Sequence, residues 1–173
     1  MSEGGGGSFD PTTIVRVLDE HGVRYVVIGG VAARLHGSPT LTEDMDVTPE
    51  RSEDNLRRLA QALAQLGARL AVPGVDGGLA VPLDQDTFSS PVMTFTTSAG
   101  EVDVVLEPAG TGGFEQLLSR AVEFEVFGVH VHVADLADII ASKETSDRPK
   151  DRVHLPLLRQ LAEELERRQD TER

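Results

Sequence analysis

Two aspartates separated by one residue, Asp44 and Asp46, lie in a short apolar segment that follows a Gly29-Gly30 pair. Side chains alternate along a strand, so carboxylates at positions i and i+2 share one face. Like charges this close repel each other unless a cation lies between them. The spacing therefore predicts a divalent-metal site, and the glycine turn beside it leaves backbone N–H groups free to meet phosphate.

A third aspartate, Asp103, stands inside the otherwise apolar segment Glu-Val-Asp-Val-Val at 101–105. A carboxylate in a strand suited to burial needs a partner. If this strand lies beside the strand of Asp44 and Asp46, three carboxylates converge. Such a triad can hold two Mg²⁺ ions, one activating an attacking hydroxyl and one bridging a triphosphate. Asp103 is also a candidate general base for that hydroxyl.

Composition limits the classes of function. The chain has 173 residues, enough for one domain with a real core, and a net charge of −13. That charge argues against a broad nucleic-acid-binding surface, and an aromatic content of 4% leaves little for base stacking. The absence of cysteine fits a cytoplasmic protein. No apolar stretch is long enough to span a membrane, so association with a membrane is not expected.

The expected organisation is a flexible leader followed by one domain. Residues 1–9 include a run of glycines and are set apart from the fold. Residues 10–173 are predicted to form a single domain whose C-terminal part, from about residue 134, is helical. The fold class is α/β (α+β), with a short mixed twisted sheet and flanking helices.

Hydrophobic periodicity and turn residues predict the individual elements. Helices are expected from Asp10-Pro11 to Gly22, at 31–35, after Ser52 as far as Gly67, and at 114–121, 135–142 and 153–168. Strands are expected at 24–28 and 43–48, and two hairpins at 92–97 with 101–106 and at 123–127 with 129–133. Residues 71–90 read mostly as loop with a short strand at 79–81, and residues 143–152 as a polar segment.

The chain resembles the DNA polymerase β-type nucleotidyltransferase superfamily in the order of its elements: a strand, a Gly-Gly pair, a short helix, an Asp-x-Asp strand and a lone Asp on a later strand. More narrowly, the segments IGGVAARLHGSPTLTEDMDV and ADIIASKETSDRPKDRVHL resemble small bacterial nucleotidyltransferases related to AbiEii-type toxins of toxin–antitoxin systems. The resemblance covers roughly residues 24–48, 100–106 and 134–158. It implies the polymerase β-type fold and transfer of a nucleoside monophosphate from a nucleoside triphosphate.

The resemblance also implies roles for residues and partners. Gly29 and Gly30 would contact the triphosphate, and the three aspartates would hold Mg²⁺ or Mn²⁺. Lys143 stands where relatives often carry a phosphate-binding lysine, and Lys150 opens the recurring Lys-Asp pair. The implied acceptor is RNA, such as a tRNA end, or a protein hydroxyl, with a cognate antitoxin as a further expected partner.

Two departures from the family pattern bear on activity. Relatives often carry an arginine shortly before the Asp-x-Asp pair, where this chain has Thr40-Leu41-Thr42, and Glu43 adds a negative charge. Both weaken phosphate attraction and leave as cations Arg34, Lys143, Arg148 and Lys150. Two alternatives therefore stand beside the enzyme: a nucleotide- or partner-binding module that has lost turnover, and a structural protein with surface carboxylates.

Other polar motifs have simpler interpretations. His130 and His132 share a strand face, but no third zinc ligand lies at a convincing spacing, so the solvent face of a hairpin is favoured. His36 is expected to cap a helix end rather than to approach a nucleotide. Glu101 is expected at a strand-end surface. The glycine-rich segment 110–113 lacks the lysine of a P-loop and reads as a helix-start loop.

Overall fold

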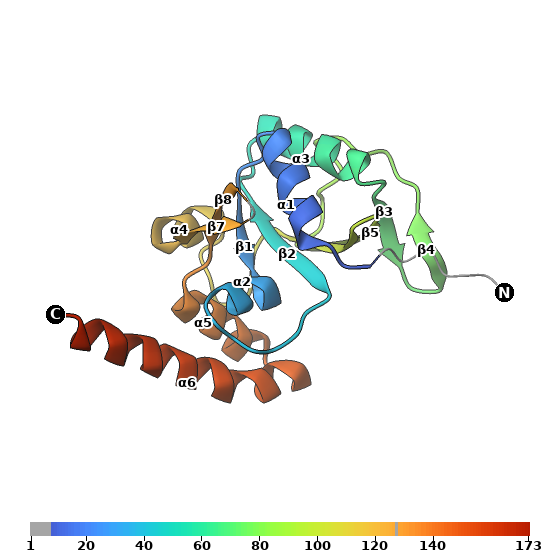
Figure 1. Ribbon diagram of the computed structural model, residues 1–173. Coiled ribbons are helices and arrows are strands. Elements are labelled where there is room, and N and C mark those ends of the chain that lie inside the picture. The colour runs from blue at the N-terminus through green and yellow to red at the C-terminus, as the bar shows by residue number, and fades with distance from the viewer. Residues whose placement is uncertain (1–7, 127) are drawn as a thin grey trace.

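The computed structural model describes residues 8–126 and 128–173, which form one mixed eight-stranded sheet with helices around it (Figure 1). The predicted fold class is confirmed. Residues 1–7 of the predicted leader, and residue 127 at the end of one predicted strand, lie outside the described residues. Within the described part, no helix is both long enough and apolar enough to cross a membrane.

The helices are α1 (Pro11–Glu20), α2 (Gly29–Leu35), α3 (Glu53–Gln65), α4 (Phe114–Arg120), α5 (Leu136–Ser146) and α6 (Pro149–Thr171). The strands are β1 (Tyr25–Ile28), β2 (Asp44–Pro49), β3 (Arg69–Val72), β4 (Val75–Leu79), β5 (Val92–Thr97), β6 (Gly100–Val105), β7 (Val122–Val126) and β8 (Val129–Val133). They are ordered β4-β3-β5-β6-β2-β1-β8-β7 in the sheet.

The strand β2 lies in the interior of the sheet, antiparallel to β1 and parallel to β6. Asp46 is paired in register with Asp103 on β6 and with Ile28 on β1. Because Ile28 is followed directly by the Gly29-Gly30 start of α2, the sheet register itself brings the glycine pair beside the aspartates.

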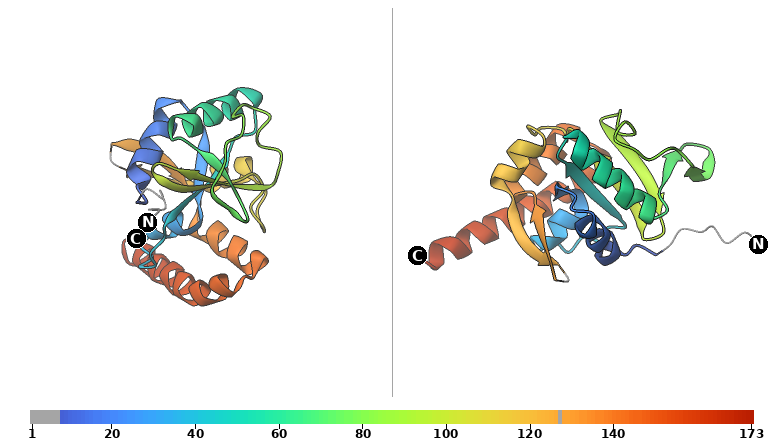
Figure 2. Two further views of the ribbon diagram at one scale, coloured as in Figure 1. Left: turned by 90° about the vertical axis from the view of Figure 1, so that its right-hand side faces the viewer. Right: turned by 90° about the horizontal axis from the view of Figure 1, so that it is seen from above.

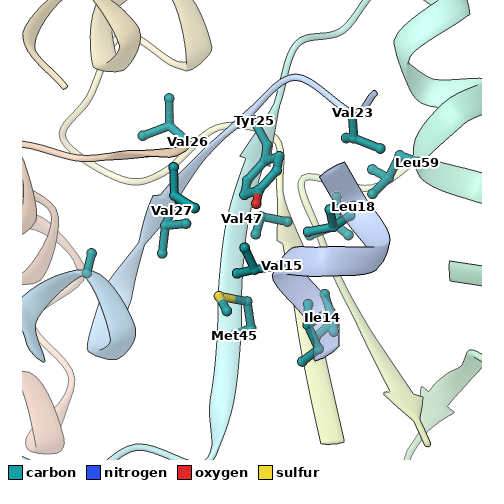
Figure 3. Close-up of a cluster of buried hydrophobic side chains, with 14 of the residues drawn as sticks. Ile14, Val15, Leu18, Val23, Tyr25, Val26, Val27, Met45, Val47 and Leu59 are labelled. Atoms are coloured by element: carbon teal, nitrogen blue, oxygen red, sulfur yellow. The ribbon is translucent and has the colours of Figure 1, made fainter. Parts of the chain in front are cut away.

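The two faces of β2 have opposite character. Met45 and Val47 are fully buried and point toward α1, where they meet Ile14 and Val15 (Figure 3). The intervening Asp44 and Asp46 therefore point to the other face, as side-chain alternation requires. Burial of the apolar face fixes the orientation of the carboxylates, because a slip by one residue would place them in the core.

One segment differs from expectation. Residues 69–79 form the β3–β4 hairpin rather than a loop, and the strand predicted at 79–81 ends at Leu79. Glycine is usually unfavourable in a strand, and Gly77 and Gly78 also have positive φ angles, of 76° and 74°. The Arg69 side chain donates to both of their carbonyls, which compensates for the weak intrinsic preference.

The polar segment predicted at 143–152 is also largely helical. The helix α5 continues to Ser146, and α6 already begins at Pro149, so only a short turn separates the two helices. Asp147 makes this turn in a left-handed conformation with φ 47°. In Figures 1 and 2, α5 and α6 lie together beneath the sheet and the C-terminal end of α6 extends beyond the rest of the molecule.

The side chain of Asp151 holds the two helices together. It is fully buried and accepts hydrogen bonds from Ser146 at 2.8 Å, from the backbone N–H of Arg148 at 3.0 Å and from the Arg148 Nε at 2.9 Å. Lys143 from α5 lies 3.4 Å away as a further positive partner. Burial by itself raises the pKa of Asp151, but these donors outweigh it and hold the pKa well below its usual range.

Replacement of Asp151 by Asn is expected to lower the free energy of unfolding by about 2–4 kcal/mol, because it leaves the largely buried side chain of Lys143 without its counter-charge. The pKa of Asp151 is lowered on folding, so its contribution is complete above the unfolded value near 4 and is lost as pH falls below it. The difference between the two proteins in denaturant melts should therefore shrink below about pH 4.

Asp147→Asn is the matched control, since its ion pair with Arg152 is exposed. Asparagine tolerates the left-handed conformation at this position. An equal loss of stability in both variants would contradict the role given to Asp151.

Candidate active site

The three aspartates predicted from the sequence converge in space. One carboxylate oxygen each from Asp44, Asp46 and Asp103 lies within 4.8 Å of the others. Two adjacent strands supply them, β2 and β6, and all three side chains are partly buried. Carboxylate oxygens at this spacing are the ligand type that Mg²⁺ and Mn²⁺ prefer.

Two threonine hydroxyls orient the carboxylates. Thr42 donates to Asp44 at 2.9 Å, and Thr94 on β5 donates to Asp103 at 2.6 Å. Each hydrogen bond occupies one acceptor position of its carboxylate and leaves others open. These bonds restrict side-chain rotation, so the oxygens are held in place before any ligand arrives.

The electrostatics of the triad favour a bound cation. Burial raises the pKa of Asp46 to about 8, assisted by its hydrogen bond with Asp103 and by the negative charge of Asp44. A carboxyl group that resists ionisation in this way lies in a poorly solvated space, where the negative charge of its carboxylate neighbours is in excess. A divalent cation would remove that excess, which supports the triad as a metal site.

Gly29 is required by close approach as well as by backbone conformation. A Cβ atom at this position would lie 1.9 Å from the Asp46 Oδ2, and its φ angle is 67°. Gly30 is similarly close to Thr42, whose Oγ1 would lie 2.7 Å from a Cβ. The glycine pair therefore lets the start of α2 lie directly against the carboxylates, where any side chain would displace them.

The triad opens into a cavity of about 390 Å³. Gly29, Gly30 and the three aspartates lie along one wall. The rest of the polar lining belongs to α5, α6 and the turn between them, and consists of Asp138, Ser142, Lys143, Ser146, Arg148, Lys150 and His154. All seven residues predicted for the site thus line one cavity, although their roles stay predictions.

The four cations expected near the site have different surroundings. Lys143 and Arg148 line the cavity, but both are paired with Asp151. Lys150 is exposed, and its charge acts to lower the pKa of Asp46. Arg34 donates to the Thr40 carbonyl and is not among the described residues that line the cavity.

The alternative motifs lie elsewhere. His36 is the C-cap residue of α2, as expected, and its side chain contacts the Ala134 carbonyl at 2.8 Å. His130 and His132 are exposed on β8, and His130 pairs with Glu123 at 3.1 Å. Within residues 8–126 and 128–173, the only cluster able to hold a metal is the aspartate triad.

Several residues that line the cavity or orient its aspartates escaped the sequence analysis. Thr42 precedes the Asp-x-Asp pair by two residues, a spacing that could have indicated contact, whereas Thr94 reaches Asp103 only through the β5–β6 register. Asp138 carried no signal, since an acid near a helix start usually just favours the helix dipole. In the structure it is 3% exposed and lines the cavity.

Comparison with known proteins supports the fold. The chain matches no protein-family model and no curated protein. A crystal structure of the lincosamide antibiotic adenylyltransferase LnuA with lincomycin bound matches with a TM-score of 0.59 and 14% identity, covering 90% of this chain and 99% of that one.

A crystal structure of ANT(2″)-Ia in complex with adenylyl-2″-tobramycin matches with a TM-score of 0.55 and 19% identity. The match covers 88% of this chain and 86% of that one. At these identities the likeness establishes the architecture alone. The chain has the fold of the polymerase β-type nucleotidyltransferases.

Proposed function

We propose that this protein is a metal-dependent nucleotidyltransferase that moves a nucleoside monophosphate from a nucleoside triphosphate to a hydroxyl acceptor. The convergence of Asp44, Asp46 and Asp103 beside Gly29 carries the proposal. Residues 10–173 act as one catalytic unit in this proposal. The helical part from about residue 134 supplies the wall opposite the triad.

The three aspartates would hold Mg²⁺ or Mn²⁺, which supplies charge neutralisation and activation of the attacking oxygen. Gly29 and Gly30 leave room for the triphosphate, and Lys150 faces it with a positive charge. The acceptor hydroxyl gives up its proton, with Asp103 as the candidate base, and its oxygen bonds to the α-phosphorus. The bond to the bridging oxygen breaks and pyrophosphate leaves. Positioning and electrostatics provide the catalysis.

The acceptor class follows from likeness rather than from a motif. Resemblance to AbiEii-type toxins favours RNA, such as a tRNA end, or a protein hydroxyl, within a cytoplasmic toxin–antitoxin pair that includes a cognate antitoxin. The solved structures of similar fold instead contain lincomycin and adenylyl-2″-tobramycin, which favours a small hydroxyl compound. The net charge of −13 makes a polyanionic acceptor harder to approach.

A second candidate function is a nucleotide- or partner-binding module with weak turnover on the same fold. The observation that favours it is the pairing of both Lys143 and Arg148 with Asp151. That pairing offsets part of the positive charge on the wall facing the triad. A lower positive charge beside the triad would weaken the binding of a triphosphate.

Without a divalent ion and at neutral pH, Asp46→Asn is expected to raise the melting temperature by a few degrees, because burial raises the pKa of Asp46 to about 8 and its carboxyl must take up a proton on folding, a cost that the neutral amide does not carry. Addition of Mg²⁺ or Mn²⁺ should then raise the melting temperature of the native protein but not that of the variant. Scanning fluorimetry in EDTA and in each metal measures both effects. Asp76→Asn, an exposed change on β4, is the control. A metal shift retained in Asp46→Asn would argue against the site.

Transfer itself is tested with each α-³²P-labelled nucleoside triphosphate, Mg²⁺ or Mn²⁺ and cell extract. Label that survives protease but not nuclease identifies RNA as the acceptor. Label that survives nuclease but not protease identifies a protein acceptor, and label that migrates as a small molecule identifies a small hydroxyl compound. Asp46→Asn should reduce transfer at least about 100-fold, whereas Asp76→Asn should not. Metal-dependent binding without transfer in any condition would favour the binding module.

Lys150→Ala is expected to weaken triphosphate binding about 3- to 10-fold, because it removes an exposed cation whose charge acts on Asp46. Lys150→Arg should retain most of the affinity. Arg168→Ala, near the far end of α6, controls for the change in net charge. Calorimetry with Mg²⁺ and triphosphate measures the affinity of each variant. Equal losses of affinity in Lys150→Ala and Arg168→Ala would contradict a local role for Lys150.

A further inference from the structure

The end of the cavity at α4 and α5 combines an apolar lining with one buried carboxylate. Asp138 is 3% exposed, and its neighbours in the cavity wall include Leu117, Ala134 and Ile139, all of them buried. Ligand sites commonly join such apolar surfaces to a few fixed polar groups. Neither the metal triad nor the predicted phosphate contacts use this part of the cavity.

The carboxylate of Asp138 is fixed in orientation. The Arg120 guanidinium binds both of its oxygens, with the Nε donating to Oδ2 at 3.1 Å. Gln116 donates to Oδ1 at 3.2 Å. Each carboxylate oxygen has two acceptor positions. Among the described residues, Oδ1 therefore has both positions used, and Oδ2 has one left.

The position of Asp138 on α5 sets its distance from the phosphate-binding residues. Asp138, Ser142 and Ser146 follow each other at intervals of four residues, so they share the face that lines the cavity. The helix rise places the two ends of this row about 12 Å apart. Beyond Ser146 come Arg148 and Lys150, whose charges act on the triad or its neighbours. Asp138 therefore lines the cavity about two turns of α5 before Ser146, and the cations of the phosphate-binding residues follow Ser146 in the chain.

We propose that this end of the cavity is a nucleobase subsite in which Asp138 Oδ2 accepts a hydrogen bond from an exocyclic amine. The inference rests on the proposed function, since it places a nucleoside triphosphate with its phosphates at the triad. A single acceptor position selects a base with an exocyclic amine at its Watson–Crick edge: guanine at position 2, adenine at position 6 or cytosine at position 4. Hypoxanthine and uracil have no exocyclic amine, and they carry a carbonyl oxygen where adenine and cytosine carry theirs, which would face the carboxylate unfavourably.

Three pairs of substrates isolate this contact. ATP and ITP differ at position 6 of the purine, GTP and ITP differ at position 2 of the purine, and CTP and UTP differ at position 4 of the pyrimidine. Calorimetry of the full chain with Mg²⁺ is expected to show about 10-fold tighter binding of the amine-bearing member in at least one pair. The triphosphate of N6,N6-dimethyladenosine, which has no N–H, should bind no better than ITP if adenine is the base.

Asp138→Asn should bring the affinity ratio within the favoured pair to about one, because the amide no longer offers a charged acceptor. Asp138→Glu, which keeps the charge but moves the oxygens, is the second variant and should also reduce the ratio. Glu115→Gln, an exposed change on α4 outside this cavity, should leave the ratio unchanged. If neither Asp138 variant folds, the comparison of ATP, ITP and the dimethyl analogue on the native protein decides.

The outcomes separate the two proposals. Equal affinity of the native protein for both members of every pair would overturn the base subsite and leave the proposed function standing. Discrimination that persists in both Asp138 variants would overturn the assignment to Asp138. Absence of metal-dependent binding for every triphosphate would overturn the proposed function and the subsite with it.

Discussion

The register between β2 and β6 is the constraint on which the site depends. It sets Asp46 directly beside Asp103, while the pairing of β2 with β1 brings the start of α2 against the same carboxylate. The resulting space is so small that even a Cβ atom at Gly29 would overlap the Asp46 carboxylate. The core on the opposite face of β2, formed around Met45 and Val47, supplies the free energy that holds these charges together.

The wall facing the triad is organised by a different interaction, the burial of Asp151. Its negative charge is compensated by Lys143 and Arg148, so α5 and α6 meet through a hydrogen-bonded ionic cluster rather than through apolar contacts alone. This arrangement gives the cavity a defined second wall. It also uses part of the positive charge that a triphosphate would meet, so the same residues couple the stability of the helical pair to the affinity of the site.

The cavity is thus polar at one end and largely apolar at the other. A chain with a net charge of −13 can still attract a triphosphate when cations and a divalent ion act at short range, because the effect of distant surface charges is screened by salt. The fixed carboxylate of Asp138 at the apolar end belongs to neither the metal site nor the cation group. Its role in nucleotide selection would connect the fold of α4 against α5 to substrate choice.

The sequence alone determined the elements with strong local signals. Alternating side chains identified Asp44 and Asp46 as a pair on one face, and Asp10-Pro11 and Ser52 marked helix starts that the structure retains. The hairpin joining β5 to β6 followed from its glycine-containing turn, and Asp103 was conspicuous as an acid in an apolar strand. These features depend on residues close together in the chain, so their physical causes can be read locally.

Only the tertiary structure decided the rest. The β3–β4 hairpin depends on Arg69 binding glycine carbonyls, and the extent of α5 and α6 depends on the cluster around Asp151. The pairing of Asp46 with Asp103 and the placement of Asp138 join residues distant in sequence. Composition and periodicity report local preferences, whereas strand register and buried ion pairs arise from contacts that exist only after the chain has folded.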